Sequence, residues 1–497
     1  MSKVDTAWLR MDSPSNLMMI VGVWTLRPGI THAALCERVR ERLLAYDRFR
    51  QRVEEDPTGA RWVEDHRFDI DHHVQRDTLA PPATAASAMT PTEALQSRVA
   101  DLATKPLDRR RPLWQMHLVE DFDGGSALIV RIHHCIADGI ALISVLLTMV
   151  DGGAEPTGLS ARRRKRAAAA EADTNANANA ASGAHKPGLA SAEDWIADTV
   201  IKPLTEIAVR ALDTVGDGAA RSMGLLRQPQ QGVAGSMDLA RTTYQVLGDA
   251  ASLALMPDDS PTRLKGQPMG QKRVAWCQPL PLDEVKAVGR ALNCSVNDVL
   301  LACVAGAIGE YLRSQGDDPA GQEIRAMIPV NLRPLEEAWR LGNRFGLVPL
   351  VLPIGIGNPV ERVYEVRRRM QALKGSTQPV LAFALLAVAG LLIKPAQDAL
   401  LNLFGKKTTA VMTNVPGPRE KLRFLGASLE QVMFWVPQSG DIGLGVSILS
   451  YGGGVQFGVI TDRALCDEPQ RIIDAFEPEF AKLSWLTLML PWEGEAQ

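Results

Sequence analysis

The sequence predicts a mixed α/β protein built from two lobes. Strand-like and helix-like segments alternate along residues 1–151 and again along residues 271–497. A low-complexity segment separates the two sections, and a chain of 497 residues is too long for one ordinary hydrophobic core. We therefore expect two related lobes, each a mixed sheet with packed helices.

Residues 1–151 are expected to form the first lobe. Met19 to Leu26 reads as a strand, and Thr31 is the expected N-cap of a helix with apolar residues at i+4 spacing. The other expected elements are a helix from Thr92 to Ala103, a hairpin of Trp114–Val119 with Ser126–Ile132 around Asp123-Gly124-Gly125, and an apolar helix from Ile140 to Val150.

The middle of the chain changes composition abruptly. Residues 152–192 hold the basic run Arg162–Arg166 and then Ala- and Asn-rich low complexity. Such a segment buries too little apolar area to offset its ordering entropy, so we expect a disordered linker. Residues 193–270 return to a broken helical pattern and are expected to form a helical connector.

Residues 271–497 are expected to form the second lobe. Asp283 and Ser295 are the expected N-caps of two helices, the second reaching about Leu312. The remaining expected elements are a strand from Ile324 to Val330, a helix opened by Asn358-Pro359-Val360-Glu361, and a hairpin of Leu444–Tyr451 with Val455–Thr461 around Gly452-Gly453-Gly454.

Composition excludes several classes of protein. A formal charge of -3 gives no general attraction to nucleic acid, and the six cysteines are too scattered for a disulfide scaffold or a zinc site. The cysteine usage fits a reducing cytosol, and the start of the chain has no signal pattern. The longest apolar run, Val380 to Ile393, is shorter than the roughly 20 residues that span a bilayer, so we expect a buried or interfacial helix.

Two histidine pairs share the spacing H-H-x-x-x-D. His133-His134 follows an apolar strand and leads through Asp138-Gly139 into an apolar helix, a context that fixes a side chain rigidly at a cleft. Imidazole accepts and returns protons near neutral pH, and Gly139 is expected to permit a turn that a side chain would block. His72-His73 lies between polar and proline-rich segments, with Thr78 in place of the glycine, so we expect this pair to be structural.

The segment His133 to Gly139 resembles the H-H-x-x-x-D-G motif of the wax ester synthase/diacylglycerol acyltransferase family. That family belongs to the coenzyme A-dependent acyltransferases of the chloramphenicol acetyltransferase-like fold, and condensation domains of peptide synthetases share the motif. Further matches are Pro112-Leu113-Trp114, Asn297-Asp298, Asn414-Val415-Pro416-Gly417-Pro418 and the late Val446–Tyr451 segment with Phe457-Gly458. The similarity runs from Asp5 to about Phe480. It departs from the family in the Ala/Asn-rich insert and at Met11-Asp12, which replaces an aromatic-acidic stretch.

The resemblance implies two chloramphenicol acetyltransferase-like lobes with an active-site channel between them. It implies that His134 is the general base, that His133 supports it, and that Asp138 turns away to pair with Arg333. Gly139 completes the catalytic motif. The candidate substrate-binding residues are Asn297, which is also the candidate oxyanion donor, Asp298, Pro112, Leu113, Trp114, Asn414, Pro416 and Gly417.

Structural alternatives exist for three of these groups. Ser295 to Asp298 is also a capping box, Pro112-Leu113-Trp114 also serves to start a strand, and Asn414 to Pro418 is also a turn sequence. The chain has no G-x-S-x-G elbow and no phosphate-binding P-loop pattern, which favours direct transfer over an acyl-enzyme.

The expected function is transfer of a long-chain acyl group from acyl-CoA to the hydroxyl of diacylglycerol or of a long-chain alcohol. No metal or cofactor is expected, since acyl-CoA is a substrate. Two alternatives stay open: a condensation-type enzyme using carrier-bound substrates, and a non-catalytic lipid-binding or lipid-droplet protein. We expect a cytoplasmic protein attached peripherally to the inner face of the plasma membrane or to lipid droplets. The basic run at Arg162–Arg166 is either a solvated linker charge or part of that attachment, together with the Val380–Ile393 helix.

Overall fold

The computed structural model describes residues 1–56, 59–79, 89–154, 258–332, 341–373 and 407–489. The expected linker, Arg162–Arg166, Arg333 and the Val380–Ile393 run therefore lie outside the described residues. Of the expected helical connector, only residues 258–270 are described, and they contain no helix.

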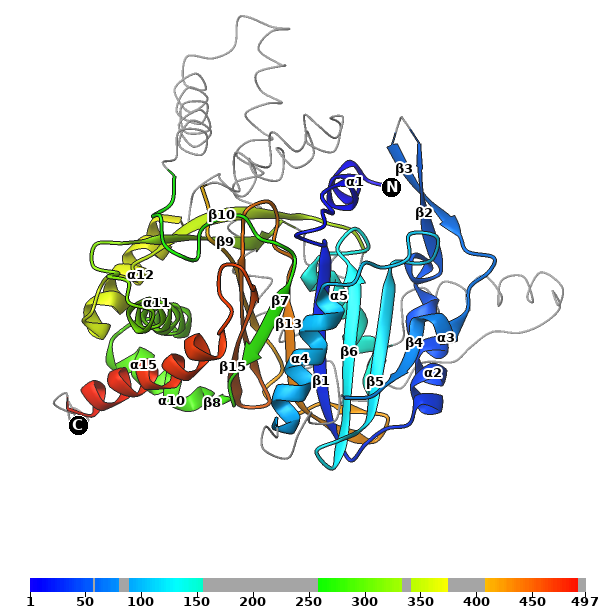
Figure 1. Cartoon of the computed structure of the whole chain (residues 1–497). Coiled ribbons are helices and arrows are strands. Elements are labelled where there is room, and N and C mark those ends of the chain that lie inside the picture. Colours follow the sequence, from blue (N-terminus) through cyan, green and yellow to red (C-terminus); the bar gives the residue numbers. More distant parts are fainter. Residues whose placement is uncertain (57–58, 80–88, 155–257, 333–340, 374–406, 490–497) are drawn as a thin grey trace, which may run out of the picture.

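Two sheets lie side by side, each with helices packed on it (Figure 1). The first is six-stranded, in the order β12-β13-β1-β6-β5-β4. Its bounds are β1 Met19–Arg27, β4 Val74–Asp77, β5 Trp114–Phe122, β6 Gly125–His133, β12 Arg423–Phe424 and β13 Ala427–Trp435. All nine residues of β6 are buried, so this strand runs through the middle of the first core.

The three helices expected in the first lobe are present and begin within one residue of the expected positions. Thr31 caps α2 (His32–Glu41), Thr90 forms a capping box on α4 (Pro91–Ala103), and Asp138 caps α5 (Gly139–Met149). The lobe also holds α1 (Lys3–Arg10), α3 (Ile70–His73) and the hairpin of β2 (Gln51–Asp56) with β3 (Gly59–Glu64). Two short turns of 3₁₀ helix, Leu43–Ala45 and Asp47–Phe49, lead into that hairpin.

The second sheet has the path β10-β9-β11-β14-β15-β7, with β8 paired to β15. Its strands are β7 Lys272–Trp276, β8 Leu280–Pro281, β9 Ile324–Asn331, β10 Phe345–Leu352, β11 Ala410–Pro416, β14 Leu444–Tyr451 and β15 Gly454–Asp462. Glycines 452 and 453 have positive φ angles of 59° and 82°, which the tight β14–β15 turn requires.

The helices of the second lobe are α10 (Leu282–Ala291), α11 (Val296–Ser314), α12 (Pro359–Leu373) and α15 (Gln470–Leu488). Helix α11 packs against the other three. Ser295 caps α11 with Asp298 in a reciprocal capping box, as expected. The expectation for Asp283 was wrong. Pro281 occupies the N-cap position of α10, and Asp283 lies in its first turn, where its charge still favours the helix dipole.

Two strands from the second section join the first sheet, which sequence reasoning missed. β13 pairs antiparallel with β1 along its length, from Val21 opposite Trp435 to Arg27 opposite Ser428. The chain therefore leaves the second sheet after β11, adds β12 and β13 to the first sheet, and returns as β14. This crossing ties the two lobes together and places residues 415–422 between them.

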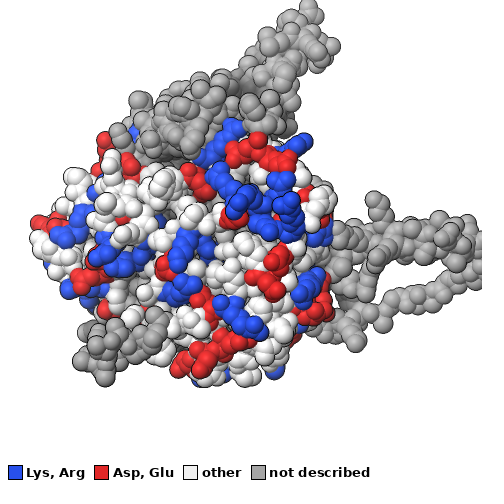
Figure 2. Space-filling model, turned by 45° about the vertical axis from the view of Figure 1, so that its right-hand side comes forward, with Lys and Arg blue, Asp and Glu red and all other residues white. Residues whose placement is uncertain are grey.

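No single described helix is long and apolar enough to cross a membrane. Helices α10 and α11 pass such a test only as a pair, and the chain bends by 99° between them. On the face in Figure 2, basic and acidic side chains both occur in small groups among neutral ones. Ion pairs at the surface of the described residues include Arg61–Glu54 and Arg110–Asp108.

Candidate active site

His134 lies immediately beyond β6, at the place where the two lobes meet. Its backbone N–H donates to the carbonyl of Met18, 2.7 Å away, which extends the pairing of β6 with β1 by one step. The side chain is only 3% exposed. Residues from the second lobe, Asn343 and Phe345 at the start of β10, pack against it. These contacts place His134 between the two lobes.

Two aromatic rings cover the His134 imidazole. Trp8 of α1 stacks on it with ring centroids 4.2 Å apart and planes 20° from parallel. Phe345 lies 5.4 Å from the imidazole and 5.7 Å from Trp8. These contacts fix the ring and remove water from around it.

A polar network fixes the backbone of His134 from the other side. Asn343 donates its side-chain N–H to the His134 carbonyl at 2.7 Å and to Oδ1 of Asp5 at 2.9 Å. Asp5 is fully buried and forms an ion pair of 3.2 Å with Arg48, which donates in turn to the carbonyl of Ile136 at 2.6 Å. Three separate segments thus hold one loop.

Burial lowers the pKa of His134 to about 4, while the side chain of Asn343 and the backbone of His134 itself act in the opposite direction. The imidazole is therefore neutral at physiological pH. Nδ1 is buried without a hydrogen-bond partner of ordinary geometry, and no described residue bonds Nε2 with such geometry, although the Asn343 side chain lies close enough to the ring to act on its pKa. A neutral imidazole with an unoccupied Nε2 can accept a proton from a bound hydroxyl.

His133 points elsewhere and makes different contacts. Its Nδ1 accepts from the N–H of Cys135 at 3.1 Å, and Nε2 lies 3.3 Å from Oδ2 of Asp12. Burial raises the pKa of Asp12, but His133, the N–H of Met18 and Arg109 lower it by more. His133 is thus fixed in one tautomer as part of the support for the loop.

Asp138 ties the motif to the second lobe. Its Oδ1 accepts from Ala141 N–H at 2.9 Å as the N-cap of α5, and its Oδ2 accepts from Arg344 N–H at 3.0 Å. Its own N–H donates to Gly342. These contacts agree with an aspartate turned away from His134, while the expected partner Arg333 lies outside the described residues.

The expectation for Gly139 was wrong. It is the first residue of α5, is absent from the positive-φ glycines of the described chain, and a Cβ added there would meet nothing within 4 Å. The backbone does not require glycine at this position. Gly139 instead leaves space at one end of an apolar pocket.

The first histidine pair has structural contacts, in line with its expected role. His73 is fully buried between Phe68 and Trp114, with ring centroids 4.9 and 4.5 Å away, and its Nδ1 lies 2.7 Å from the carbonyl of Trp114. His72 contacts His73 edge to face.

Pro112, Leu113 and Trp114 support the motif through backbone and core contacts. The carbonyl of Leu113 accepts from His133 N–H at 2.9 Å, and the Trp114 indole donates to Phe49. Trp114 is fully buried. A direct contact of these three residues with substrate stays a prediction.

The structure brings Asn414 onto Asn297. The Asn414 side-chain N–H donates to Oδ1 of Asn297 at 2.5 Å, so the amide N–H₂ of Asn297 points away from this bond. Asp298 is used by the capping box. Beyond Asn414, residues 415–418, including Pro416 and Gly417, line the apolar pocket.

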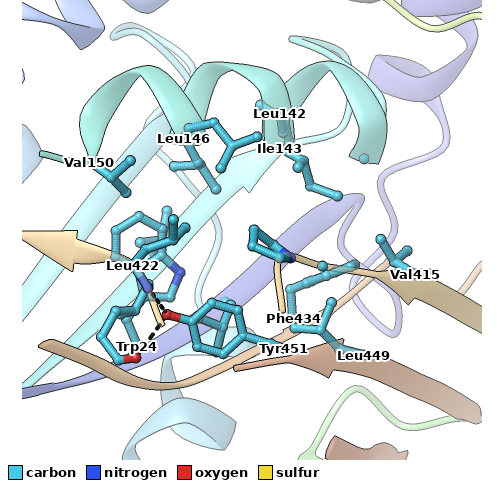
Figure 3. Close-up of a pocket in the computed structure, with 18 of the residues that line it drawn as sticks. Trp24, Leu142, Ile143, Leu146, Val150, Val415, Leu422, Phe434, Leu449 and Tyr451 are labelled. Carbon is cyan, nitrogen blue, oxygen red and sulfur yellow. Dashed lines mark hydrogen bonds between the residues drawn. The ribbon is translucent and has the colours of Figure 1, made fainter. Parts of the chain in front are cut away.

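This pocket lies beneath α5, between the first sheet and the crossing segment (Figure 3). It encloses about 900 Å³ of empty space, counting open solvent at its edge. Its lining is apolar and comes from four places: β1 and β6, α5, residues 415–422, and strands β13 and β14. The residues are Ile20, Gly22, Trp24, Val130, Ile132, Gly139, Leu142, Ile143, Leu146, Leu147, Val150, Val415, Pro416, Gly417, Pro418, Leu422, Leu429, Val432, Phe434, Leu449 and Tyr451.

One group of possible metal ligands occurs in the described part of the chain, formed by His32, Cys36 and Asp71. The Cys36 sulfur lies 3.7 Å from both ring nitrogens of His32, and His32 Nε2 contacts the carbonyl of Val74 at 2.7 Å. Nε2 of His32 therefore already has a polar partner in the carbonyl of Val74.

Sequence reasoning missed Asp5, Trp8, Asp12, Arg48 and Asn343. Four of them lie more than 85 residues before His134 in the chain, and Asn343 lies more than 200 residues after it. Asp12 carried one signal, because Met11-Asp12 stands where the family has its aromatic-acidic stretch. The others have no spacing pattern that marks them.

Comparison with known proteins agrees with this architecture. The family described as "Wax ester synthase/diacylglycerol acyltransferase catalytic domain" matches residues 1–300, and the C-terminal domain of the same family matches residues 341–484. The Mycobacterium tuberculosis protein named "Probable diacyglycerol O-acyltransferase tgs1" is 27% identical over 92% of this chain and 89% of its own length. A second protein of that organism, named with tgs2, is 26% identical over 96% of this chain and 97% of its own.

Two solved structures share the fold. The wax ester synthase/diacylglycerol acyltransferase of Marinobacter aquaeolei VT8 superposes with a TM-score of 0.62 at 21% identity, covering 98% of this chain and 100% of that one. The starter condensation domain of rhizomide synthetase, solved with C8-CoA, gives a TM-score of 0.52 at 15% identity, with 98% and 94% covered. The family match over most of the chain identifies this protein as an acyltransferase that belongs to the wax ester synthase/diacylglycerol acyltransferase family.

Proposed function

We propose that this acyltransferase moves a long-chain acyl group from acyl-CoA to the hydroxyl of diacylglycerol or a long-chain alcohol, with His134 as the general base. The observation that carries the proposal is a neutral imidazole with an unoccupied Nε2, five residues before a glycine that lines a large apolar pocket. The products are triacylglycerol or wax ester, together with free CoA.

The reaction proceeds by direct attack. The acceptor hydroxyl donates its hydrogen bond to Nε2 of His134, and its oxygen attacks the thioester carbonyl as the proton moves to the imidazole. The tetrahedral oxyanion then collapses, the carbon–sulfur bond breaks, and the imidazolium returns the proton to the departing thiolate of CoA. General-base assistance contributes roughly 10²–10⁴ in rate, so binding and oxyanion stabilisation supply the rest.

Asn297 is the proposed donor to the oxyanion. Because its Oδ1 accepts from Asn414, its N–H₂ group has a fixed orientation, and it makes no hydrogen bond within the described residues. A preoriented amide donor costs little reorganisation at the moment of reaction. Asp298 holds the helix start beneath it through the capping box.

Attachment to a lipid surface is part of the proposal, since both expected products and both expected acceptors are water-insoluble. At the end of α15, Trp485, Leu488 and Met489 are 69%, 58% and 81% exposed. Apolar side chains of this kind insert at the boundary between headgroups and acyl chains. We expect binding to vesicles of phosphatidylcholine and phosphatidylglycerol, weakened several-fold by the Leu488→Ser variant.

The test compares two neighbouring histidines. We expect His134→Ala to lose at least 10²-fold in CoA release from palmitoyl-CoA with hexadecanol or dipalmitoylglycerol as acceptor. The rate of CoA release should fall less in His133→Ala, because His133 acts on the loop through Asp12 and not on the substrate. Turnover like wild type in the His134 variant would refute the assignment. Transfer from an acyl-carrier thioester but not from acyl-CoA would mean that the donor is carrier-bound and that the proposed donor is wrong.

A further inference from the structure

The apolar pocket runs along β1, away from the end of β6 where His134 lies. Along β1 the residues that face it are Ile20, Gly22 and Trp24, and Ile20 is paired with Ile132, two residues before His134. Strand residues two apart share a face, so the His134 end of the pocket lies at Ile20 and the far end at Trp24. Four residues of strand separate those ends by roughly 13 Å.

Rigid contacts hold the far end. Trp24 meets Phe424 edge to face, with ring centroids 5.5 Å apart. The Tyr451 hydroxyl accepts from Leu422 N–H and donates to the carbonyl of Leu429, both at 2.8 Å. Figure 3 shows Trp24, Leu422 and Val150 gathered at one end, with Val415 at the other.

The wall of the pocket has a gap halfway along. Gly22 lies between Ile20 and Trp24, and a Cβ added there would meet Met433 O at 3.4 Å and Phe434 Cβ at 3.7 Å, which are ordinary contacts. A larger side chain at this position would therefore fit the sheet and project into the pocket. Gly22 sets how far along β1 the pocket stays open.

The lining suits one unbranched apolar chain. The hydroxyl of Tyr451 is already used by Leu422 and Leu429, so a glycerol oxygen inserted here would lose its hydrogen bonds to water without replacement. A diacylglycerol also carries two chains, whereas this is one pocket with an almost wholly apolar lining. The acyl chain of the thioester is the one substrate part that every reaction of this enzyme would share.

We propose that the pocket beneath α5 measures the acyl chain of the donor, with Trp24 as the stop at its end and Gly22 as the residue that keeps it open. The inference rests on the proposed function and names the residues that set its preferred chain length. A chain that reaches Trp24 gains all the available contacts, and a longer one cannot be accommodated without displacing a tryptophan fixed by Phe424.

The experiment measures kcat/KM for acyl-CoA donors from C8 to C20 with one acceptor, hexadecanol. Trp24→Ala should shift the optimum to longer chains, and Gly22→Leu should shift it to shorter ones. Each methylene that no longer fits should lower kcat/KM by roughly fourfold. Opposite shifts in two variants of one strand cannot come from general damage to the fold, which would lower all chain lengths in parallel.

Val145→Ala is the matched control. Val145 is a buried residue of α5 that does not line the pocket, so its loss disturbs packing of the same helix without changing the pocket. Its chain-length profile should keep the wild-type optimum. A profile shifted by Val145→Ala but unchanged in both pocket variants would overturn the inference.

A second series varies the alcohol from C8 to C20 with palmitoyl-CoA as donor. If the pocket variants shift this profile and leave the donor profile unchanged, the pocket holds the acceptor and the inference is wrong. Absence of CoA release from every donor in the wild type would instead refute the proposed function. The two failures are therefore distinguishable.

Discussion

Trp8 of α1 stacks on His134 with ring centroids 4.2 Å apart, so a residue near the start of the chain encloses the proposed catalytic base. Together with Phe345, it leaves the imidazole 3% exposed. Burial is the largest cause of the lowered pKa of His134. The first helix therefore acts on the chemistry through desolvation, although it contributes no reacting group.

Removing this cover should move the pH profile. In Trp8→Ala, water gains access to His134, and we expect its pKa to rise from about 4 toward the ordinary value of a histidine. Because a general base works in its neutral form, the acid limb of kcat/KM should move to higher pH, by about one unit. Steady-state CoA release between pH 4.5 and 8 measures the shift.

The exposed Tyr364 of α12 provides the control for that measurement. Tyr364→Ala removes an aromatic ring at a distance from the motif in sequence and should leave the acid limb where it is in the wild type. An acid limb unchanged in Trp8→Ala would show that this residue does not set the pKa of the base.

Asn343 is predicted to position the base. Its amide joins the His134 carbonyl to the buried carboxylate of Asp5, so Asn343→Ala would leave both acceptors without this donor. A displacement of the loop by a fraction of an ångström should lower kcat roughly 10- to 100-fold, with KM for acyl-CoA nearly unchanged. Steady-state kinetics with varied palmitoyl-CoA separate the two constants.

Asn358 offers a comparison of the same residue type. Its side chain caps α12 by accepting from Val360 N–H at 3.0 Å, so Asn358→Ala should cost about 1 kcal/mol of stability with little change in kcat. Equal kinetic losses in the two variants would mean that Asn343 acts through stability alone.

The sequence predicted the local elements of this fold well and its long-range connections poorly. The apolar run before His133, the caps Thr31 and Ser295, and the glycine turn at 452–453 all encode structure within a few residues, and each is present. The addition of β13 to the edge of β1 depends on packing between segments about 400 residues apart. No local pattern specifies such a pairing.

The residues of the candidate site show the same difference between local and long-range features. His134 was identifiable because the motif is contiguous and its strand context is local. Trp8 and Asn343 were not, because each is an ordinary side chain until the fold brings it to the imidazole. Gly139 shows the converse error: a glycine was given a backbone role, whereas the structure shows a helical residue with open space at its Cα.

Asp138 is predicted to support the fold more than the chemistry. Asp138→Ala removes the N-cap of α5 and the acceptor for Arg344 N–H, and the loss of a cap alone costs about 0.5–2 kcal/mol. We expect a lower thermal midpoint together with a lower kcat, since residues of α5 also form one wall of the pocket. Thr31→Ala removes the cap of α2 and should lower the midpoint comparably without the loss of kcat. A fully stable but inactive Asp138→Ala protein would contradict this role.

Acid should destabilise the protein through its buried histidines. Burial lowers the pKa values of His73, His117 and His134 to about 4, whereas an unfolded chain has an ordinary histidine pKa near 6.5. As the pH falls between those values, the unfolded state binds protons first. The contribution of these histidines to the free energy of unfolding is therefore fully present above about pH 6.5. It is lost as the pH falls toward 4, by on the order of 3 kcal/mol for each histidine.

Thermal midpoints at pH 7.5, 6 and 5 measure this loss, and His117 provides the variant that isolates one contribution. Both of its ring nitrogens are buried without a hydrogen-bond partner, so His117→Leu removes a titrating group and leaves the neighbouring hydrogen bonds intact. The fall in midpoint between pH 7.5 and 5 should be smaller in this variant than in the wild type. Equal falls in the two proteins would mean that His117 does not contribute to the loss of stability in acid.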